Sequence, residues 1–139
     1  MEGMNCTAPH LITGRAGEDV AADYLKENGY VIVCRNYKPY SQEIDIIAHK
    51  DKYIVFVEVK TRREVKNPQY GRPSNAVNAK KRANLAKAAQ CFIKNFPSDN
   101  FYRFDVIEVL VCSDRNTGKG SYKINHMKGV FGAGGKIWI

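Results

Sequence analysis

Four charged residues interrupt two strand-like runs in the stretch QEIDIIAHKDKYIVFVEVKTRR, residues 42–63. They are Glu43, Asp45, Glu58 and Lys60. Carboxylates gathered in one place repel one another unless a cation neutralises them, and Mg²⁺ is typically held by one or two carboxylates with water and substrate phosphate. A lysine beside such a cation could orient or deprotonate a water molecule for attack on phosphorus. These residue types therefore favour metal-dependent phosphoester chemistry.

Strand geometry predicts that the charges project from one face of a sheet. In the run YIVFVEVKTR, residues 53–62, the odd positions are apolar almost throughout. The even positions begin as apolar residues and become charged halfway along, at Glu58, Lys60 and Arg62. Because alternate side chains of a strand point to opposite faces, this strand is expected to start in the core and to emerge at a polar site.

A hairpin joins this run to the preceding one, EIDIIAH, through the turn HKDK. A turn centred on those four residues places Asp45 opposite Phe56 and Glu43 opposite Glu58. Opposite residues in a ladder share a face. In this register Asp45 and Glu58 are diagonal neighbours, with about 7–8 Å between their Cα atoms. Carboxylates in this arrangement could converge on one cation.

An ion-pair ladder between the two strands explains the same charges without a metal. Lys60 would then pair with Glu58 or Glu43 across the hairpin. The E-x-K triplet is common in proteins, but here an aspartate in the preceding strand and two arginines after the lysine accompany it. On the residues alone, both interpretations stay open.

Glu18 is a further acidic residue with two interpretations. It lies on a helix predicted over residues 14–28, in line with Ala21, Ala22 and Leu25. A carboxylate on a small, apolar stripe could add a group to the site. Alternatively, the helix dipole favours an acidic residue near a helix N-terminus, whatever its function.

The surrounding pattern predicts an α/β protein with the order helix, three strands, helix, strand and a last short strand. Short links favour antiparallel pairing of the first three strands, whereas the strand–helix–strand connection favours a parallel pair. The result is a mixed sheet flanked by helices. Besides the first helix, the expected elements are strands 30–37, 43–49 and 53–62, a helix over 74–96, and strands 101–112 and 121–127.

The length of 139 residues fits one domain, expected over residues 13–131 with a flexible leader (1–12) and a flexible tail (132–139). The first 59 residues carry six basic and nine acidic residues, a net charge of −3, and the rest carry sixteen and five, a net charge of +11. A basic half beside an acidic cluster favours a polyanionic partner, of which nucleic acid is the commonest.

Basic side chains could bind that partner. Arg62 and Arg63 follow the E-x-K triplet and could hold a phosphate. The others are expected to track a phosphate backbone, although a solvated helix face explains several of them equally well; they are Lys66, Arg72, Lys80, Lys81, Arg82 and Lys87.

The four cysteines form no C-x-x-C pair, and the three histidines show no ligand spacing. Free thiols in a reducing compartment are therefore expected rather than disulfides or a zinc site. The first residues contain no apolar signal region, and no run is long enough to cross a membrane. The pattern favours a cytoplasmic protein without a membrane partner.

Four blocks of the sequence resemble a known bacterial family. They are GRAGEDVAADYLKENGYVIVCRNY, EIDIIAHKDKYIVFVEVKTRR, YGRPSNAVNAKKRANLAKAA and YRFDVIEV. Their order and spacing resemble the YraN-type family, which is labelled uncharacterised and looks like a branch of the PD-(D/E)xK nuclease superfamily near the archaeal Holliday-junction resolvases. The resemblance runs from about Thr13 to Phe131.

The resemblance implies a restriction-endonuclease-like fold and a metal-dependent nuclease site. Matched residue by residue, Asp45 stands for the superfamily's aspartate, and Glu58 and Lys60 stand for its (D/E)xK pair. Glu18 matches an acidic residue on the first helix of the resolvase-like branch. The implied ligands of a Mg²⁺ or Mn²⁺ ion are Asp45, Glu58 and Glu18, with Lys60 positioning the water; Glu43 has no assigned role.

The expected function is that of a metal-dependent DNA endonuclease acting on branched or junction DNA, and a homodimer is expected by analogy with resolvases. One departure is Gln42, which stands where the family usually has glycine but removes no ligand. The alternative is a nucleic-acid-binding module of nuclease fold without catalytic activity. A third interpretation is a protein-interaction domain whose charges form ladder ion pairs.

Overall fold

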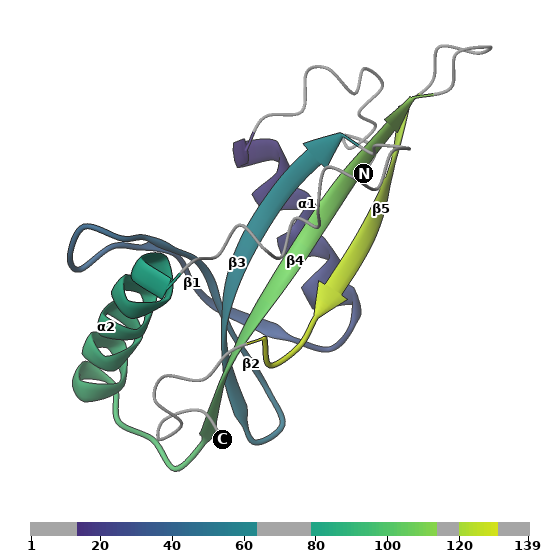
Figure 1. The fold of residues 1–139 in the computed structure, drawn as a ribbon. Helices are drawn as coiled ribbons and strands as arrows, with labels where there is room; N and C mark the ends of the chain where they lie inside the picture. Colours follow the sequence, from purple (N-terminus) through teal and green to yellow (C-terminus); the bar gives the residue numbers. More distant parts are fainter. Residues whose placement is uncertain (1–13, 64–78, 114–119, 131–139) are drawn as a thin grey trace.

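The computed structural model describes residues 14–63, 79–113 and 120–130 (Figure 1). The predicted leader and tail and most of the predicted loop 63–73 lie outside these ranges. The expected order of helix, three strands, helix and strand is confirmed, and a last strand follows it. The elements are α1 (Gly14–Glu27), β1 (Val31–Tyr37), β2 (Ile44–Lys50), β3 (Tyr53–Arg63), α2 (Ala79–Asn95), β4 (Phe101–Ser113) and β5 (Gly120–Met127).

The strands form one mixed sheet in the order β1-β2-β3-β4-β5. As predicted, β1 to β3 pair antiparallel, and β3 pairs parallel with β4 across the connection that contains α2. The strand β5 adds an antiparallel edge beside β4. This arrangement confirms the expected α/β class and is consistent with a restriction-endonuclease-like fold.

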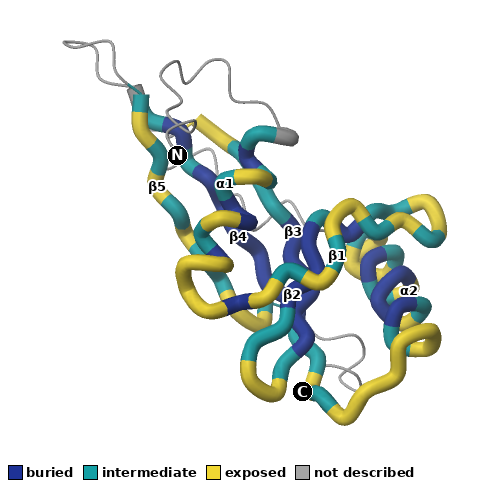
Figure 2. The backbone as a smooth tube through the Cα atoms, turned by 180° about the vertical axis from the view of Figure 1, so that it is seen from behind, coloured by how far each residue is buried: buried dark blue, intermediate teal, exposed yellow. Residues whose placement is uncertain are grey.

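The two helices cover opposite faces of the sheet, and β3 supplies side chains to both. Phe56 packs in the cluster that includes Leu85 and Phe92 of α2. Its neighbours Val55 and Val57 pack in the other cluster, with residues of α1. The buried residues therefore concentrate in the central strands between the helices (Figure 2). This alternation is the predicted period of two, and it delivers the even positions of β3 to the α2 side.

The hairpin register differs from the predicted one by two residues. The turn consists of Asp51 and Lys52, so Ile47 pairs with Phe56, where the prediction placed Asp45. Asp51 has a φ of 55°, a left-handed conformation that aspartate adopts more readily than most residues. A shift of two residues preserves which side chains share a face, so Asp45 and Glu58 are still expected on one face, but the predicted pairing of Glu43 with Glu58 is wrong.

The end of α1 follows the sequence signal closely. Gly29 has a φ of 88°, and the N–H of Tyr30 donates to the carbonyl of Leu25 at 2.9 Å. This is the Schellman arrangement, in which glycine adopts the left-handed conformation that stops a helix. The chain then turns directly into β1. Within the described ranges, neither helix has the length and apolar character needed to cross a membrane.

Candidate metal centre

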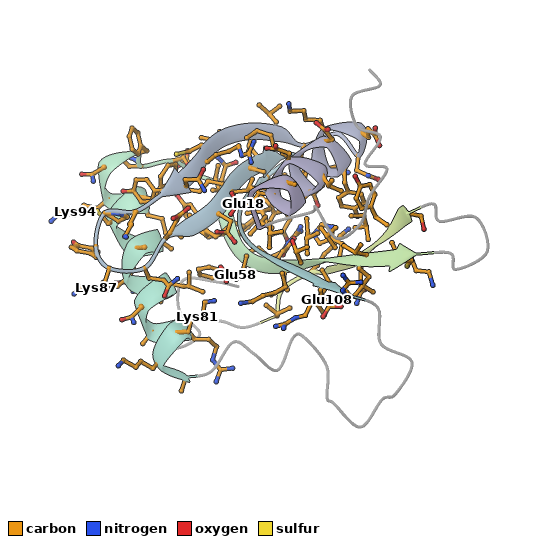
Figure 3. All side chains as sticks on the ribbon, turned by 90° about the horizontal axis from the view of Figure 1, so that it is seen from above. Glu18, Glu58, Lys81, Lys87, Lys94 and Glu108 are labelled. Carbon is orange, nitrogen blue, oxygen red and sulfur yellow. The ribbon has the colours of Figure 1, made fainter. Side chains whose placement is uncertain are left out.

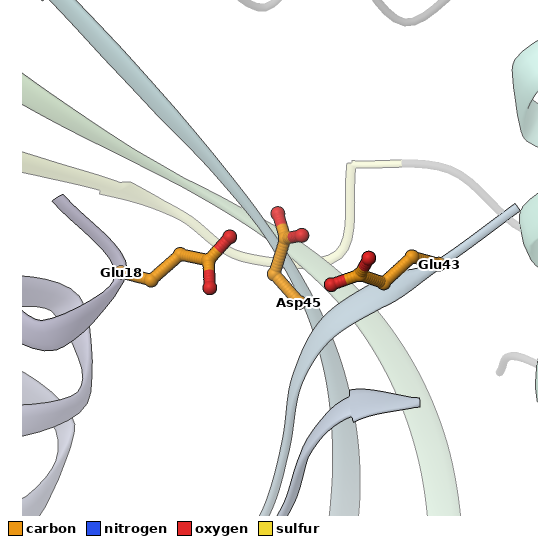
Figure 4. Close-up of side chains that lie close together, drawn as sticks. All are labelled: Glu18, Glu43 and Asp45. Carbon is orange, nitrogen blue, oxygen red and sulfur yellow. The ribbon is translucent and has the colours of Figure 1, made fainter. Parts of the chain in front are cut away.

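Three carboxylates gather where α1 meets the start of β2 (Figure 4). Glu18 extends from α1, Glu43 immediately precedes β2, and Asp45 lies between them on β2. One ligand oxygen from each residue lies within 4.8 Å of the others, and all three side chains are half-buried. The structure therefore places Glu43, which was predicted on the same face but had no assigned role, beside Glu18 and Asp45.

Asp45 reaches this group because the ladder between β2 and β3 stops before it. The last ladder pair is Ile46–Val57, although β3 continues to Arg63. Beyond that pair the backbone N–H of Val59 donates to Asp45 Oδ2 at 2.8 Å. Burial, followed by repulsion from Glu58, raises the pKa of Asp45 to about 7. The surroundings of Asp45 therefore disfavour its negative charge.

Glu58 lies on the α2 side of β3 and is only 5% exposed. One oxygen, Oε2, forms ion pairs with Lys60 Nζ at 3.3 Å and with Lys81 Nζ at 2.5 Å. The other oxygen, Oε1, is buried and accepts no hydrogen bond from the part of the chain that the structure describes. A buried carboxylate oxygen without a partner is costly unless a further group binds it.

The two lysines on Glu58 differ in their electrostatics. Burial and then the contact with Lys81 lower the pKa of Lys60. Burial opposes the charge of Lys81 as well, but its hydrogen bonds to Glu58 and Lys60 outweigh burial and raise its pKa. Lys60 is thus the lysine of the pair that gives up a proton more readily. Figure 3 shows Glu58 and Lys81 on their two elements.

The other predicted basic residues are distributed around the ends of β3 and α2. Lys81 is half-buried and paired with Glu58, and its contact with a phosphate backbone stays a prediction. Lys87 is exposed, and its Nζ lies 4.7 Å from the centre of the Tyr40 ring. Lys66 and Arg72 lie outside the described residues. The remaining predicted side chains are exposed; they are Arg62, Arg63, Lys80 and Arg82.

Two residues at the site were not predicted. Asn36 of β1 donates from its side-chain amide to both Glu18 and Glu43. Glu108 of β4 is buried, pairs in the β3–β4 register with Lys60 and accepts a hydrogen bond from Asn125. Both are polar residues at interior positions of predicted strands, and this signal could have identified them.

A second polar cluster lies on the α1 side of β4, and sequence reasoning missed it. Asp105 is fully buried and accepts hydrogen bonds from Arg103 Nε at 2.8 Å and from the backbone N–H of Gly129 at 3.0 Å. His126 Nε2 lies 2.7 Å from the same carboxylate, and its Nδ1 lies 3.0 Å from the hydroxyl of Tyr24. Each oxygen of Asp105 has a partner, so this cluster joins α1, β4 and β5.

The donor set of the first cluster fits a hard divalent cation. It offers only oxygens, from carboxylates carried by α1 and by the chain before and within β2. Mg²⁺ and Mn²⁺ prefer such ligands. Two further observations agree with this interpretation. Glu58 Oε1 is buried without a hydrogen-bond partner in the described residues, and the pKa of Asp45 is raised.

The sheet and this cluster define an α/β protein with a candidate oxygen-ligand metal centre. Its sequence matches the model of the Uncharacterised protein family UPF0102 over residues 17–109, more than half of the chain. The chain belongs to this family, which confirms the resemblance to the YraN-type sequences.

Individual relatives cover most of the chain. A UPF0102 protein of Chloroherpeton thalassium is 48% identical over 99 residues, which are 70% of this chain and 74% of the relative. One from Caldicellulosiruptor bescii is 44% identical over 120 residues, 85% of this chain and 95% of the relative. One from Chlorobium phaeobacteroides is 42% identical over 126 residues, which are 90% of this chain and 96% of the relative. The family is uncharacterised, so its name assigns no activity.

Proposed function

We propose that the protein is a Mg²⁺- or Mn²⁺-dependent DNA endonuclease. The observation that carries the proposal is the convergence of Glu18, Glu43 and Asp45 beside the buried Glu58, whose Oε1 has no partner in the described residues. A purely structural ion-pair ladder would match each carboxylate with a cation. The ion pairs described for these carboxylates involve Glu18 and Glu58, whereas burial, followed by repulsion from Glu58, raises the pKa of Asp45.

The metal ligands in this proposal are Asp45 and Glu58, assisted by Glu18 and Glu43. When bound, the metal ion would polarise the scissile phosphate and offset its developing negative charge. Asp45 is held in place by the N–H of Val59, which fixes one oxygen and leaves the other available. Burial between β3 and α2 fixes Glu58. These contacts preorganise the carboxylates before any substrate arrives.

Lys60 is the residue that positions the attacking water. Its Nζ is 3.3 Å from Glu58 Oε2, so the ammonium group lies at the edge of the carboxylate cluster. Because its pKa is lowered, a larger fraction of Lys60 than of an ordinary lysine is neutral near pH 7, and only the neutral amine can accept a proton from water. Its side chain is 17% exposed, so it is partly accessible to water.

DNA is the proposed substrate class, with branched or junction DNA favoured. Exposed Arg62 and Arg63 continue β3 beyond Lys60, and exposed Lys80 lies on α2 next to Lys81. Such side chains bind phosphates without reading bases, which suits selection by shape. A homodimer would give two such sites for the two strands of a junction.

The test is a strand-cleavage assay on matched linear and four-way-junction DNA, with Mn²⁺, with Mg²⁺ and with EDTA. We expect metal-dependent cleavage that Lys60→Gln reduces at least about a hundredfold, as removal of a group acting in proton transfer does. Lys94→Gln is the control, because Lys94 is an exposed lysine in the last turn of α2. It should leave cleavage unchanged.

A binding measurement beside the cleavage assay separates the proposed endonuclease from the alternative, a binding module without activity. Binding of DNA, measured by fluorescence anisotropy, should survive in Lys60→Gln. Tight binding by the wild-type protein with no cleavage under any metal condition would favour a nucleic-acid-binding module and reject the enzyme.

A further inference from the structure

Asn36 on β1 makes contacts that the proposed chemistry does not explain. Its Nδ2 donates to Glu18 Oε1 at 3.0 Å and to Glu43 Oε2 at 2.5 Å. The two glutamates come from different parts of the chain, one on α1 and one before β2. A single amide group therefore bridges two of the three clustered carboxylates.

The backbone of β1 places Asn36 next to the carboxylates. The register of β1 and β2 runs from Arg35–Ile46 to Tyr37–Ile44, which puts Asn36 opposite Asp45. Asn36 has a φ of 56° inside a strand, a left-handed conformation that asparagine, like aspartate, adopts more readily than most residues. In this conformation the side-chain amide contacts both glutamates.

The side-chain amide of Asn36 is neutral, but its N–H groups can offset part of the negative charge of nearby carboxylates. Its two N–H hydrogens carry partial positive charge and can serve two acceptors at once. Hydrogen bonds to ionised carboxylates are stronger than neutral ones. Without Asn36, Glu18 and Glu43 would lose this shared donor, although Arg35 Nη2 lies 3.8 Å from Glu18 Oε1.

We propose that Asn36 is a placeholder for the metal ion. In the metal-free protein its amide occupies the position between Glu18 and Glu43, keeps them assembled, and must release them when a divalent cation binds. Asn36 thereby competes with the metal and weakens its affinity. This inference rests on the proposed metal centre and adds to it a residue that sets metal affinity.

Calorimetric titration with Mn²⁺ at pH 8 tests this competition. The variant is Asn36→Gly, because glycine accepts a φ of 56° without strain while removing the amide. We expect it to bind Mn²⁺ on the order of tenfold more tightly than the wild type, since the metal no longer has to break two charge-assisted hydrogen bonds. Tyr24→Phe is the control: it removes the hydroxyl that contacts His126, remote from the carboxylates, and should leave Mn²⁺ affinity unchanged.

A wild-type measurement covers the case in which Asn36→Gly fails to fold. The side-chain amide signals of Asn36, assigned by nuclear magnetic resonance, should shift and exchange faster with water when Mg²⁺ is added. Equal or weaker Mn²⁺ binding by a folded Asn36→Gly, or amide signals that do not respond to bound Mg²⁺, would overturn the placeholder role. Failure of the wild-type protein to bind Mn²⁺ would instead reject the metal centre itself.

Discussion

Helix α1 approaches strand β3 so closely at Gly17 that a methyl group there would lie 1.8 Å from Thr61 Oγ1. Gly17 directly precedes Glu18, so this contact determines how far the Glu18 carboxylate extends toward Asp45. Thr61 Oγ1 is itself buried without a hydrogen-bond partner in the described residues. The close approach therefore serves the position of the helix rather than a polar contact.

Gly17→Ala is expected to destabilise the protein although alanine favours helices. Overpacking should cost about 1–3 kcal/mol, more than the helix propensity of alanine returns, and should weaken Mn²⁺ binding by displacing Glu18. Denaturant unfolding in EDTA and Mn²⁺ titration measure the two effects. Adding Thr61→Ala should restore most of the lost stability and Mn²⁺ affinity. It removes Oγ1, the nearest atom, and leaves the Cβ of residue 61 at 3.1 Å from the Cβ of Ala at position 17. An unchanged stability in Gly17→Ala would contradict this packing.

Because of Asp45, we expect the stability of the metal-free protein to depend on pH in an unusual direction. Burial, then repulsion from Glu58, raises its pKa from 3.8 to about 7 in the folded protein. The folded state thus holds a proton that the unfolded chain has already released, and metal-free stability should fall as the pH rises from about 4 to about 7.

Asp45→Asn removes this penalty while keeping an oxygen for the N–H of Val59. It should stabilise the metal-free protein by about 1–3 kcal/mol at pH 8 and have little effect near pH 4. Urea unfolding in EDTA at the two pH values checks the prediction. A variant less stable than the wild type at pH 8 would show that the carboxylate is compensated within the fold.

Lys81 is predicted to contribute to stability, unlike its neighbours on α2. Lys81→Gln removes one of the two lysines that pair with the buried Glu58 and should cost about 1–2 kcal/mol in the absence of metal. Lys87→Gln is the matched comparison, because Lys87 is exposed on the same helix, and it should change stability by less than about 0.5 kcal/mol. Equal losses in the two variants would argue against the Glu58–Lys81 pair.

The Asp105 cluster is predicted to support the fold without affecting the metal site. Burial opposes the charge of Asp105, but hydrogen bonds from His126, Arg103 and Gly129 prevail and lower its pKa. Its contribution is therefore present above about pH 4 and is lost as the pH falls through the lowered pKa. Asp105→Asn should cost about 3–5 kcal/mol at pH 7, because it leaves Arg103 without its charge partner.

Two comparisons complete that prediction. Asp99→Asn, at an exposed aspartate, should leave the unfolding midpoint unchanged. Mn²⁺ affinity should be the same in Asp105→Asn and in the wild type at a temperature where both are folded. A large loss of Mn²⁺ affinity in Asp105→Asn would place this cluster in the metal site.

The sequence predicted the parts of the site that depend on local geometry. Alternation along β3 requires only the strand itself, so Glu58 and Lys60 were correctly placed on one face. The hairpin register was wrong because HKDK allows the turn to lie at more than one pair of residues, and the left-handed Asp51 decides between them. The predicted assignment of side chains to the two faces of the sheet was unaffected, because the register error was an even number of residues.

Contacts between distant elements could not be read from the sequence. Asn36 reaches Glu18 because β1 and α1 pack side by side, 18 residues apart in the chain. Lys81 reaches Glu58 across the connection from β3 to α2, and the partners of Asp105 come from as far along the chain as Gly129. Each of these pairs depends on tertiary packing, for which neither spacing nor residue type gives a local signal.

Titration of the metal-free protein with Mn²⁺, followed by electron paramagnetic resonance of the free ion, tests the central claim most directly. The claim predicts saturable binding that Asp45→Asn abolishes, that Glu18→Gln and Glu43→Gln each weaken, and that Lys60→Gln retains. It would be contradicted if the wild-type protein bound no Mn²⁺, or if Asp45→Asn bound the ion as tightly as the wild type does.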